Sequence, residues 1–185
     1  MENDFLNEQA QKELLALARR TLELYLSDQA LLSLKSETPL LQRKSGAFVT
    51  LHAQGELRGC IGRMFAEEPL HQTVRDMAIA AATEDFRFEP VSFEELFQID
   101  IEISVLTPFQ KIQDLDEIEV GKHGLFITQG RHRGLLLPQV ASEHAWNREE
   151  FLAHTCIKAG LLPKAWMDPK TQIEIFSAQV FGEEK

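Results

Sequence analysis

The stretch "AFVTLHAQGELRGCIG", residues 47–62, predicts two β-strands joined by a tight turn. Gln54-Gly55 supplies the turn, because glycine is favoured where a hairpin needs a positive φ. In the first strand the side chains alternate between two faces, with Phe48, Thr50 and His52 on one and Val49 and Leu51 on the other. The second strand is short and ends among glycines. This hairpin indicates an antiparallel sheet.

The segments nearest the hairpin predict two helices and a third strand. Apolar residues at helical spacing give a long helix over about residues 7–26, and residues 33–46 are expected to form a loop. Pro69 suits the first position of a second helix, which runs to about residue 83. The alternating "IDIEISVL", residues 99–106, is typical of a half-buried antiparallel strand.

The C-terminal part predicts a second hairpin, a helix and a last strand. The hairpin is expected over residues 125–137, and the helix between Asn147 and Gly160, which suit its two ends. "QIEIFSAQVF", residues 172–181, is apolar on both faces and predicts one central strand. This order of elements favours an α+β fold, with a mostly antiparallel sheet covered by helices.

Composition narrows the classes of function. The chain has 185 residues, and its 29 acidic against 19 basic residues give a net charge of -10, which argues against broad nucleic-acid binding. We see no secretory signal and no apolar run near the ~20 residues that span a bilayer, so a cytoplasmic protein without membrane contact is expected. Cys60 and Cys156 are then expected as free thiols. Neither cysteine has strong metal-ligand spacing, and the familiar cofactor motifs are absent, so we expect no metal and no cofactor.

Cys60 is the first candidate for chemistry, because it lies between two glycines and two arginines. A thiolate is the reactive form of cysteine, and Arg58 or Arg63 could supply a stabilising cation. Gly59 and Gly62 would leave backbone N–H groups accessible, as an oxyanion hole requires. The alternative is structural, since free cysteine is often a small core residue and glycine in a strand often marks a bulge.

A cysteine nucleophile usually needs a histidine base. His71, His144 and His154 are candidates, although each could equally be a surface histidine or a hydrogen-bonded core histidine. "EDFRFEP" places Asp85 and Arg87 in one turn, where the pair could bind a substrate or lock the turn by pairing with each other.

A second polar group follows the predicted second hairpin. In "LLLPQVASEHAW", residues 135–146, Gln139 comes after a strand and a proline and could project into a cleft beside Glu143. Trp146 could line that cleft, although large aromatic side chains usually belong to a core. Cys156 shares a helix face with Leu152 and is expected in the core.

The string "LRGCIG", residues 57–62, resembles the hallmark of the AMMECR1 family. The resemblance covers about residues 8–182 as a single domain, and it extends through the blocks at residues 46–62, 78–96, 99–108, 134–161 and 173–181. It implies an α+β fold with a larger sheet-containing lobe, a smaller lobe and a cleft between them. It also implies a place in the prokaryotic AmmeMemoRadiSam system, with a Memo-like protein and a radical SAM enzyme as partners.

The resemblance assigns the family's motif positions to this chain. They are Arg58, Gly59, Cys60, Gly62, Arg87, Phe88, Pro138, Gln139, Glu143 and Trp146. We therefore expect a cleft that acts on or binds a small anionic or amide-bearing molecule through Cys60, with Glu143 and His144 as further catalytic residues. Substrate binding is expected from Arg58, Gly59, Gly62, Arg87, Gln139 and Trp146. The alternatives are a binding module without turnover, or a protein that the radical SAM enzyme modifies at Gly59-Cys60.

Overall fold

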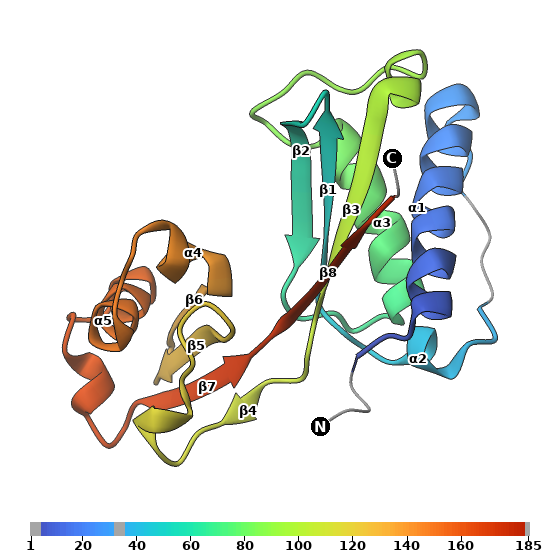
Figure 1. Ribbon diagram of the computed structural model, residues 1–185. Coiled ribbons are helices and arrows are strands. Elements are labelled where there is room, and N and C mark those ends of the chain that lie inside the picture. The colour runs from blue at the N-terminus through green and yellow to red at the C-terminus, as the bar shows by residue number, and fades with distance from the viewer. Residues whose placement is uncertain (1–4, 32–35, 184–185) are drawn as a thin grey trace. The chain divides into compact units, whose positions relative to one another are not determined.

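The computed structural model describes residues 5–31 and 36–183 and divides the chain into two units. The first unit is Met1–Leu106 with Gln179–Lys185, and the second is Thr107–Ala178. Each contains an antiparallel sheet and helices, so the predicted α+β class is confirmed (Figure 1). The two units agree with the two lobes that the family resemblance implies, and the cleft between lobes stays a prediction.

The first sheet contains the predicted hairpin. Its strand order is β2-β1-β3-β8, with β2 at Glu56–Arg63, β1 at Ala47–Ala53, β3 at Ile99–Leu106 and β8 at Ala178–Gly182. Gln54 and Gly55 form the turn with φ values of 53° and 85°, the left-handed conformation that this type of hairpin requires. Because β2 is an edge strand, one side of its backbone has no neighbouring strand.

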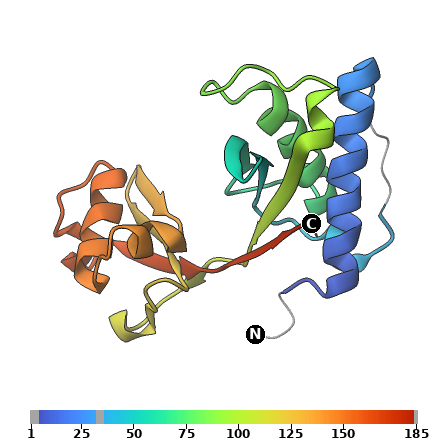
Figure 2. The same ribbon diagram turned by 45° about the horizontal axis from the view of Figure 1, so that its top comes forward.

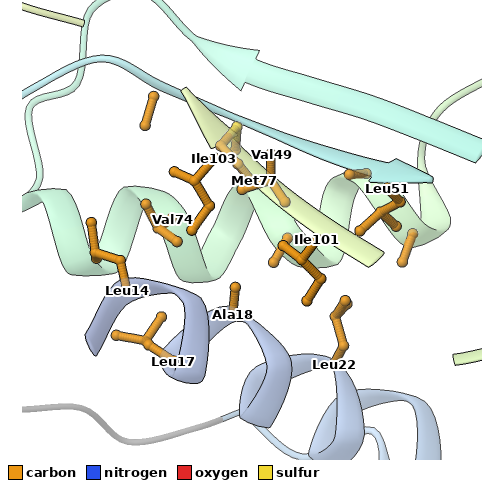
Figure 3. Close-up of a cluster of buried hydrophobic side chains, with 14 of the residues drawn as sticks. Leu14, Leu17, Ala18, Leu22, Val49, Leu51, Val74, Met77, Ile101 and Ile103 are labelled. Carbon is orange, nitrogen blue, oxygen red and sulfur yellow. The ribbon is translucent and has the colours of Figure 1, made fainter. Parts of the chain in front are cut away.

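Two helices, α1 (Glu8–Asp28) and α3 (Leu70–Thr83), cover one face of this sheet (Figures 1 and 2). Val49 and Leu51 point into the core between sheet and helices and are fully buried (Figure 3). By strand alternation, Phe48, Thr50 and His52 of β1 point away from the helices. We call this opposite side of the first sheet the helix-free face, since α1 and α3 both lie on the other side.

The second unit has its own sheet and core. The strand order is β4-β7-β5-β6, with β4 at Gln110–Lys111, β7 at Gln172–Phe176, β5 at Gly124–Gln129 and β6 at His132–Leu136. Two helices follow β6, namely α4 (Pro138–Glu143) and α5 (Arg148–Lys158). Asn147 caps α5 in a reciprocal capping box with Glu150, as predicted. Short 3₁₀ turns lie at Glu95–Gln98 in the first unit and at Leu115–Glu117 and Ala165–Met167 in the second.

The prediction of one final strand over residues 172–181 is wrong. This segment forms β7 and β8, which belong to different sheets and are separated at Ser177. The Thr107 N–H donates to the Ser177 carbonyl at 2.8 Å, and the Ser177 N–H donates to Thr107 Oγ1 at 2.8 Å. The segment is apolar throughout because β7 contributes to one core and Phe181 of β8 packs against the other.

Some elements were missed from the sequence. Residues 33–35 of the predicted loop lie outside the described residues, but Pro39–Gln42 forms a short helix, α2, with Leu41 fully buried. The helix α4 and the two-residue strand β4 were also not predicted. Among the described residues, we find no helix with the length and apolar content needed to cross a membrane.

Candidate functional site

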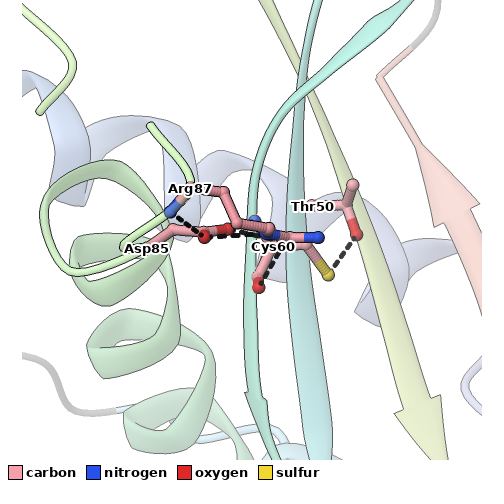
Figure 4. A network of polar contacts seen from close by, with 4 residues as sticks. All are labelled: Thr50, Cys60, Asp85 and Arg87. Atoms are coloured by element: carbon pink, nitrogen blue, oxygen red, sulfur yellow. Dashed lines mark hydrogen bonds and ion pairs between the residues drawn. The ribbon is translucent and has the colours of Figure 1, made fainter. Parts of the chain in front are cut away.

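Cys60 lies near the middle of the edge strand β2, and its side chain is on the helix-free face. Its partner in the strand register is Thr50, whose side chain points the same way. The Thr50 hydroxyl donates a hydrogen bond to Cys60 Sγ at 3.3 Å (Figure 4). The cysteine is partly exposed and is not in a disulfide. Its sulfur therefore does not belong to the aliphatic core.

The backbone of Cys60 is held at the open edge of the sheet by Asp85 and Arg87. The Cys60 N–H donates to Asp85 Oδ2 at 2.9 Å, and Arg87 Nη2 donates to the Cys60 carbonyl at 3.4 Å (Figure 4). The two side chains thus replace the neighbouring strand that an edge residue lacks. We call Asp85 and Arg87 the strand-edge clamp.

The two members of the clamp also bind each other. Arg87 Nε donates to Asp85 Oδ1 at 2.9 Å, and Arg87 Nη2 donates to Asp85 Oδ2 at 2.7 Å. The hydrogen bond from Arg87, aided by the Cys60 and Arg87 backbone N–H groups, holds the pKa of Asp85 far below its usual range, although burial opposes the shift. The bond from Asp85 raises the pKa of Arg87, with a smaller contribution from charge at Cys60. The pair is therefore ionised at all physiological pH values.

Arg87 keeps part of its binding capacity. Its side chain is 43% exposed, whereas that of Asp85 is 3% exposed. In the described part of the chain, Arg87 Nη1 has no hydrogen-bond partner. Asp85 and Arg87 pair with each other and so lock their turn, which is one of the two roles considered from the sequence. The Nη1 group of Arg87 nevertheless remains available to an anion.

Arg58 is engaged elsewhere. Its guanidinium forms a two-pronged ion pair with Glu95, in which Nη2 donates to Oε2 at 3.0 Å. It also lies over the ring of Phe88, 5.8 Å from the ring centre, and Arg87 lies 5.5 Å from the same centre. Arg58 is the extra residue of a β-bulge between the register pairs Leu51–Gly59 and His52–Leu57. The arginine beside the Cys60 backbone is therefore Arg87.

The two glycines of the motif have packing roles. A Cβ on Gly59 would lie 2.2 Å from the Ala81 carbonyl oxygen of α3, and one on Gly62 would lie 2.2 Å from the ring of Phe48. By antiparallel alternation, the N–H of Gly59 turns toward β1 while that of Cys60 turns outward to Asp85. Gly59 is thus required by the close approach of α3, and the expectation that its N–H is open to an anion is not met.

The other predicted site residues belong to the second unit. Gln139 and Glu143 are exposed on α4, and His144 caps the end of that helix. The ring centres of His144 and Trp146 are 4.6 Å apart and those of Trp146 and His154 are 3.9 Å apart, and both pairs are stacked. The structure thus brings His144, Trp146 and His154 together as a stack of rings within the second unit.

Two further candidates are structural. His71 is 2% exposed, and its Nδ1 lies 2.9 Å from the Leu41 carbonyl, so it is a core histidine and not a base. Cys156 is fully buried in the second core, as predicted, and this burial raises the pKa of its thiol. Among the described residues, no three His, Cys, Asp or Glu side chains converge on a possible metal position.

The sequence interpretation missed Thr50 and Glu95, which contact the two central motif side chains. Thr50 was placed on the correct strand face, and strand pairing would have put it opposite Cys60. The ion pair from Arg58 to Glu95 joins residues 37 positions apart and has no local signal. The role of Asp85 as acceptor of the Cys60 N–H was likewise not predicted.

Comparisons with known proteins agree on the family. The AMMECR1 family model matches residues 15–181. Protein Mbar_A1807 of Methanosarcina barkeri is 47% identical, over 91% of this chain and 88% of that protein. Protein TK0174 of Thermococcus kodakarensis is 44% identical, over 92% of this chain and 89% of that protein. The crystal structure of protein PH0010 from Pyrococcus horikoshii matches with a TM-score of 0.81 and 40% identity, covering 97% of this chain and 94% of that chain. The chain is a member of the AMMECR1 family.

Proposed function

We propose that this chain uses the thiol of Cys60 on a small anionic or amide-bearing molecule that Arg87 helps to bind. The position of Cys60 carries this proposal. Cys60 is partly exposed with its side chain on the helix-free face, the Thr50 hydroxyl donates to its sulfur, and the guanidinium of Arg87 donates to its carbonyl. A hydroxyl proton directed at sulfur and a nearby cation are both suited to a thiolate.

The chemistry that fits is nucleophilic attack. The sulfur forms a bond to an electrophilic carbon of the substrate, for example an amide carbonyl, and the thiol proton is released. The bond from that carbon to the leaving group then breaks, and an amine leaves with a proton. Water hydrolyses the resulting thioester and restores the thiol. Arg87 Nη1 would bind a carboxylate or phosphate of the substrate, because a guanidinium edge matches such oxygens.

Alkylation with two reagents of different charge tests the site. Iodoacetate and iodoacetamide form the same S–C bond and release iodide, but only iodoacetate is an anion. We expect the ratio of their rate constants at Cys60 to be roughly threefold to tenfold higher in the folded chain than in urea, the factor that about 1 kcal/mol of attraction gives. Because the chain carries a net charge of -10, a raised ratio requires local positive charge. The tryptic peptide from Gly59 to Arg63 reports the modification.

Two arginine variants locate that charge. Arg87→Gln should return the ratio toward its value in urea. Arg63→Gln, which removes an exposed arginine from the strand that carries Cys60, should leave most of the increase in the ratio. Arg87→Lys keeps the positive charge and should keep part of the increase in the ratio. An equal ratio in folded and unfolded wild type, or an equal loss in both glutamine variants, would refute the anion-binding role of Arg87.

A binding module without turnover remains the alternative from the sequence. A small anion that raises the melting temperature equally in wild type and in Cys60→Ser would support binding alone. The roles predicted for Glu143, His144, Gln139 and Trp146 stay predictions, as does the partnership with a Memo-like protein and a radical SAM enzyme. The packing of Gly59 against α3 does not favour modification at that residue.

A further inference from the structure

The six histidines of the chain differ in how their rings are engaged. The rings of His71, His123 and His132 lie within hydrogen-bond distance of backbone groups, and those of His144 and His154 stack on Trp146. In the part of the chain that the structure describes, the ring of His52 has no hydrogen-bond partner and no ring contact. His52 is half-buried, so its side chain lies against the protein with its ring nitrogens uncommitted.

His52 shares the helix-free face with Cys60. It follows Thr50 by two positions on β1, and Thr50 is the register partner of Cys60 on β2. His52 is therefore a neighbour of Cys60 on this face, with the β-bulge at Arg58 between their register positions. Diagonal neighbours in a regular antiparallel pair are roughly 7–8 Å apart, a separation that an aromatic side chain can bridge. Bringing the ring to the sulfur requires a change of rotamer, which takes picoseconds to nanoseconds for an exposed side chain.

We infer that His52 is the general base for Cys60, an inference that rests on the proposed function. A ring nitrogen of His52 takes the proton of the Cys60 thiol as the sulfur attacks, and the imidazolium returns it to the leaving group. The sequence led us to seek the base at His144, which belongs to the second unit. His52 comes from the strand directly beside Cys60 and needs no contribution from that unit.

The charged groups around His52 fit this role. Asp100 of β3 is its direct register partner, and Glu102 of β3 is the partner of Thr50. Both acidic side chains lie on the same face of the sheet as His52. Arg58 of β2 is held by Glu95, and Cys60 is the other ionisable neighbour from β2. The opposite face of β1 is covered by α3 and carries Val49 and Leu51.

The pH dependence of alkylation by the neutral reagent iodoacetamide tests the inference. A cysteine that has a histidine base reacts well near pH 6.5, whereas a cysteine without one needs alkaline pH. We expect His52→Gln to lower the rate constant at Cys60 roughly tenfold at pH 6.5 and to leave it within about twofold at pH 10, where a thiol is ionised without help. His132→Gln is the control, because His132 belongs to the second unit and its ring lies beside the Ala159 carbonyl, and it should leave the whole profile unchanged.

The far-UV circular dichroism spectrum and the urea midpoint at pH 6.5 show whether the variant is folded, and the rate at pH 10 shows whether the thiol of Cys60 is still accessible. If His52→Gln fails to fold, His52→Asn takes its place, because its amide nitrogen occupies the position of Nδ1. A folded His52 variant whose profile matches wild type overturns the inference, and so does an equal loss in His132→Gln. Neither result affects the proposed function, which is tested by the charge selectivity of Cys60 and its dependence on Arg87.

Discussion

Replacing Asp85 by asparagine tests the strand-edge clamp with little change in side-chain size. Each carboxylate oxygen of Asp85 accepts two hydrogen bonds. Oδ2 accepts the Cys60 N–H at 2.9 Å and Arg87 Nη2 at 2.7 Å, and Oδ1 accepts the Arg87 backbone N–H at 3.2 Å and Nε at 2.9 Å. An amide nitrogen in either place faces two donors, so one backbone bond and one charge-assisted bond are lost.

The loss of these two hydrogen bonds sets the expected change in the free energy of unfolding. A bond to a charged group contributes about 1.5–3 kcal/mol and a neutral backbone bond about 1 kcal/mol. Because the side chain of Arg87 is 43% exposed, hydrogen bonds to water offset part of the lost free energy. We expect the free energy of unfolding at pH 7 to fall by about 2–3 kcal/mol, measured by urea denaturation. Asp76→Asn is the matched control, since Asp76 pairs with Arg75 and is 30% exposed, and it should cost less than about 1 kcal/mol.

The pH dependence gives a second reading of the same variant. The pKa of Asp85 is lowered in the folded state, so on acidification the unfolded chain takes up the proton first. The stabilisation is therefore complete above about pH 5 and is lost as the pH falls further. The difference between wild type and Asp85→Asn should be constant from pH 7 to about pH 5 and narrow in stronger acid. A cost at pH 7 that equals the cost of Asp76→Asn would refute our account of the clamp.

Two further predictions concern packing. Gly59→Ala should lower the free energy of unfolding by about 3 kcal/mol, because its Cβ would lie 2.2 Å from the Ala81 carbonyl oxygen and α3 would have to move. Gly55→Ala is the comparison, since its Cβ would have nothing within 4 Å, and it should cost about 1 kcal/mol from its positive φ alone. Cys156 should resist iodoacetamide in the folded chain and react in urea, because burial raises the pKa of its thiol and blocks access, and rapid labelling of both free cysteines under native conditions would contradict this.

Local signals in the sequence were enough for most of the fold. Alternation in residues 99–106 and the turn at Gln54-Gly55 predicted strands that the structure confirms, because both depend on neighbouring residues alone. The same use of local signals gave a wrong prediction for residues 172–181. An apolar segment does not reveal which core each residue enters, and the break at Ser177 depends on Thr107, 70 positions away.

The candidate site was only partly predictable for a related reason. The motif around Cys60 was visible in the sequence, but its neighbours come from other strands and turns. Thr50 is 10 positions away, Asp85 is 25 and Glu95 is 37 from its partner Arg58. His52 was visible on the correct strand face, yet without strand pairing nothing linked it to Cys60.

An edge strand can hold a residue firmly and still expose its side chain, because backbone groups lie in the plane of the sheet and side chains point out of it. The strand-edge clamp acts in the plane of the sheet, where it binds both the N–H and the carbonyl of Cys60. It does not contact the side chain of Cys60, which points out of the sheet on the helix-free face and contacts Thr50 there. Because Asp85 is buried and ionised, it also fixes the guanidinium of Arg87 at this position before any ligand arrives. A preorganised cation loses little entropy on binding an anion, which is the property the proposed site needs.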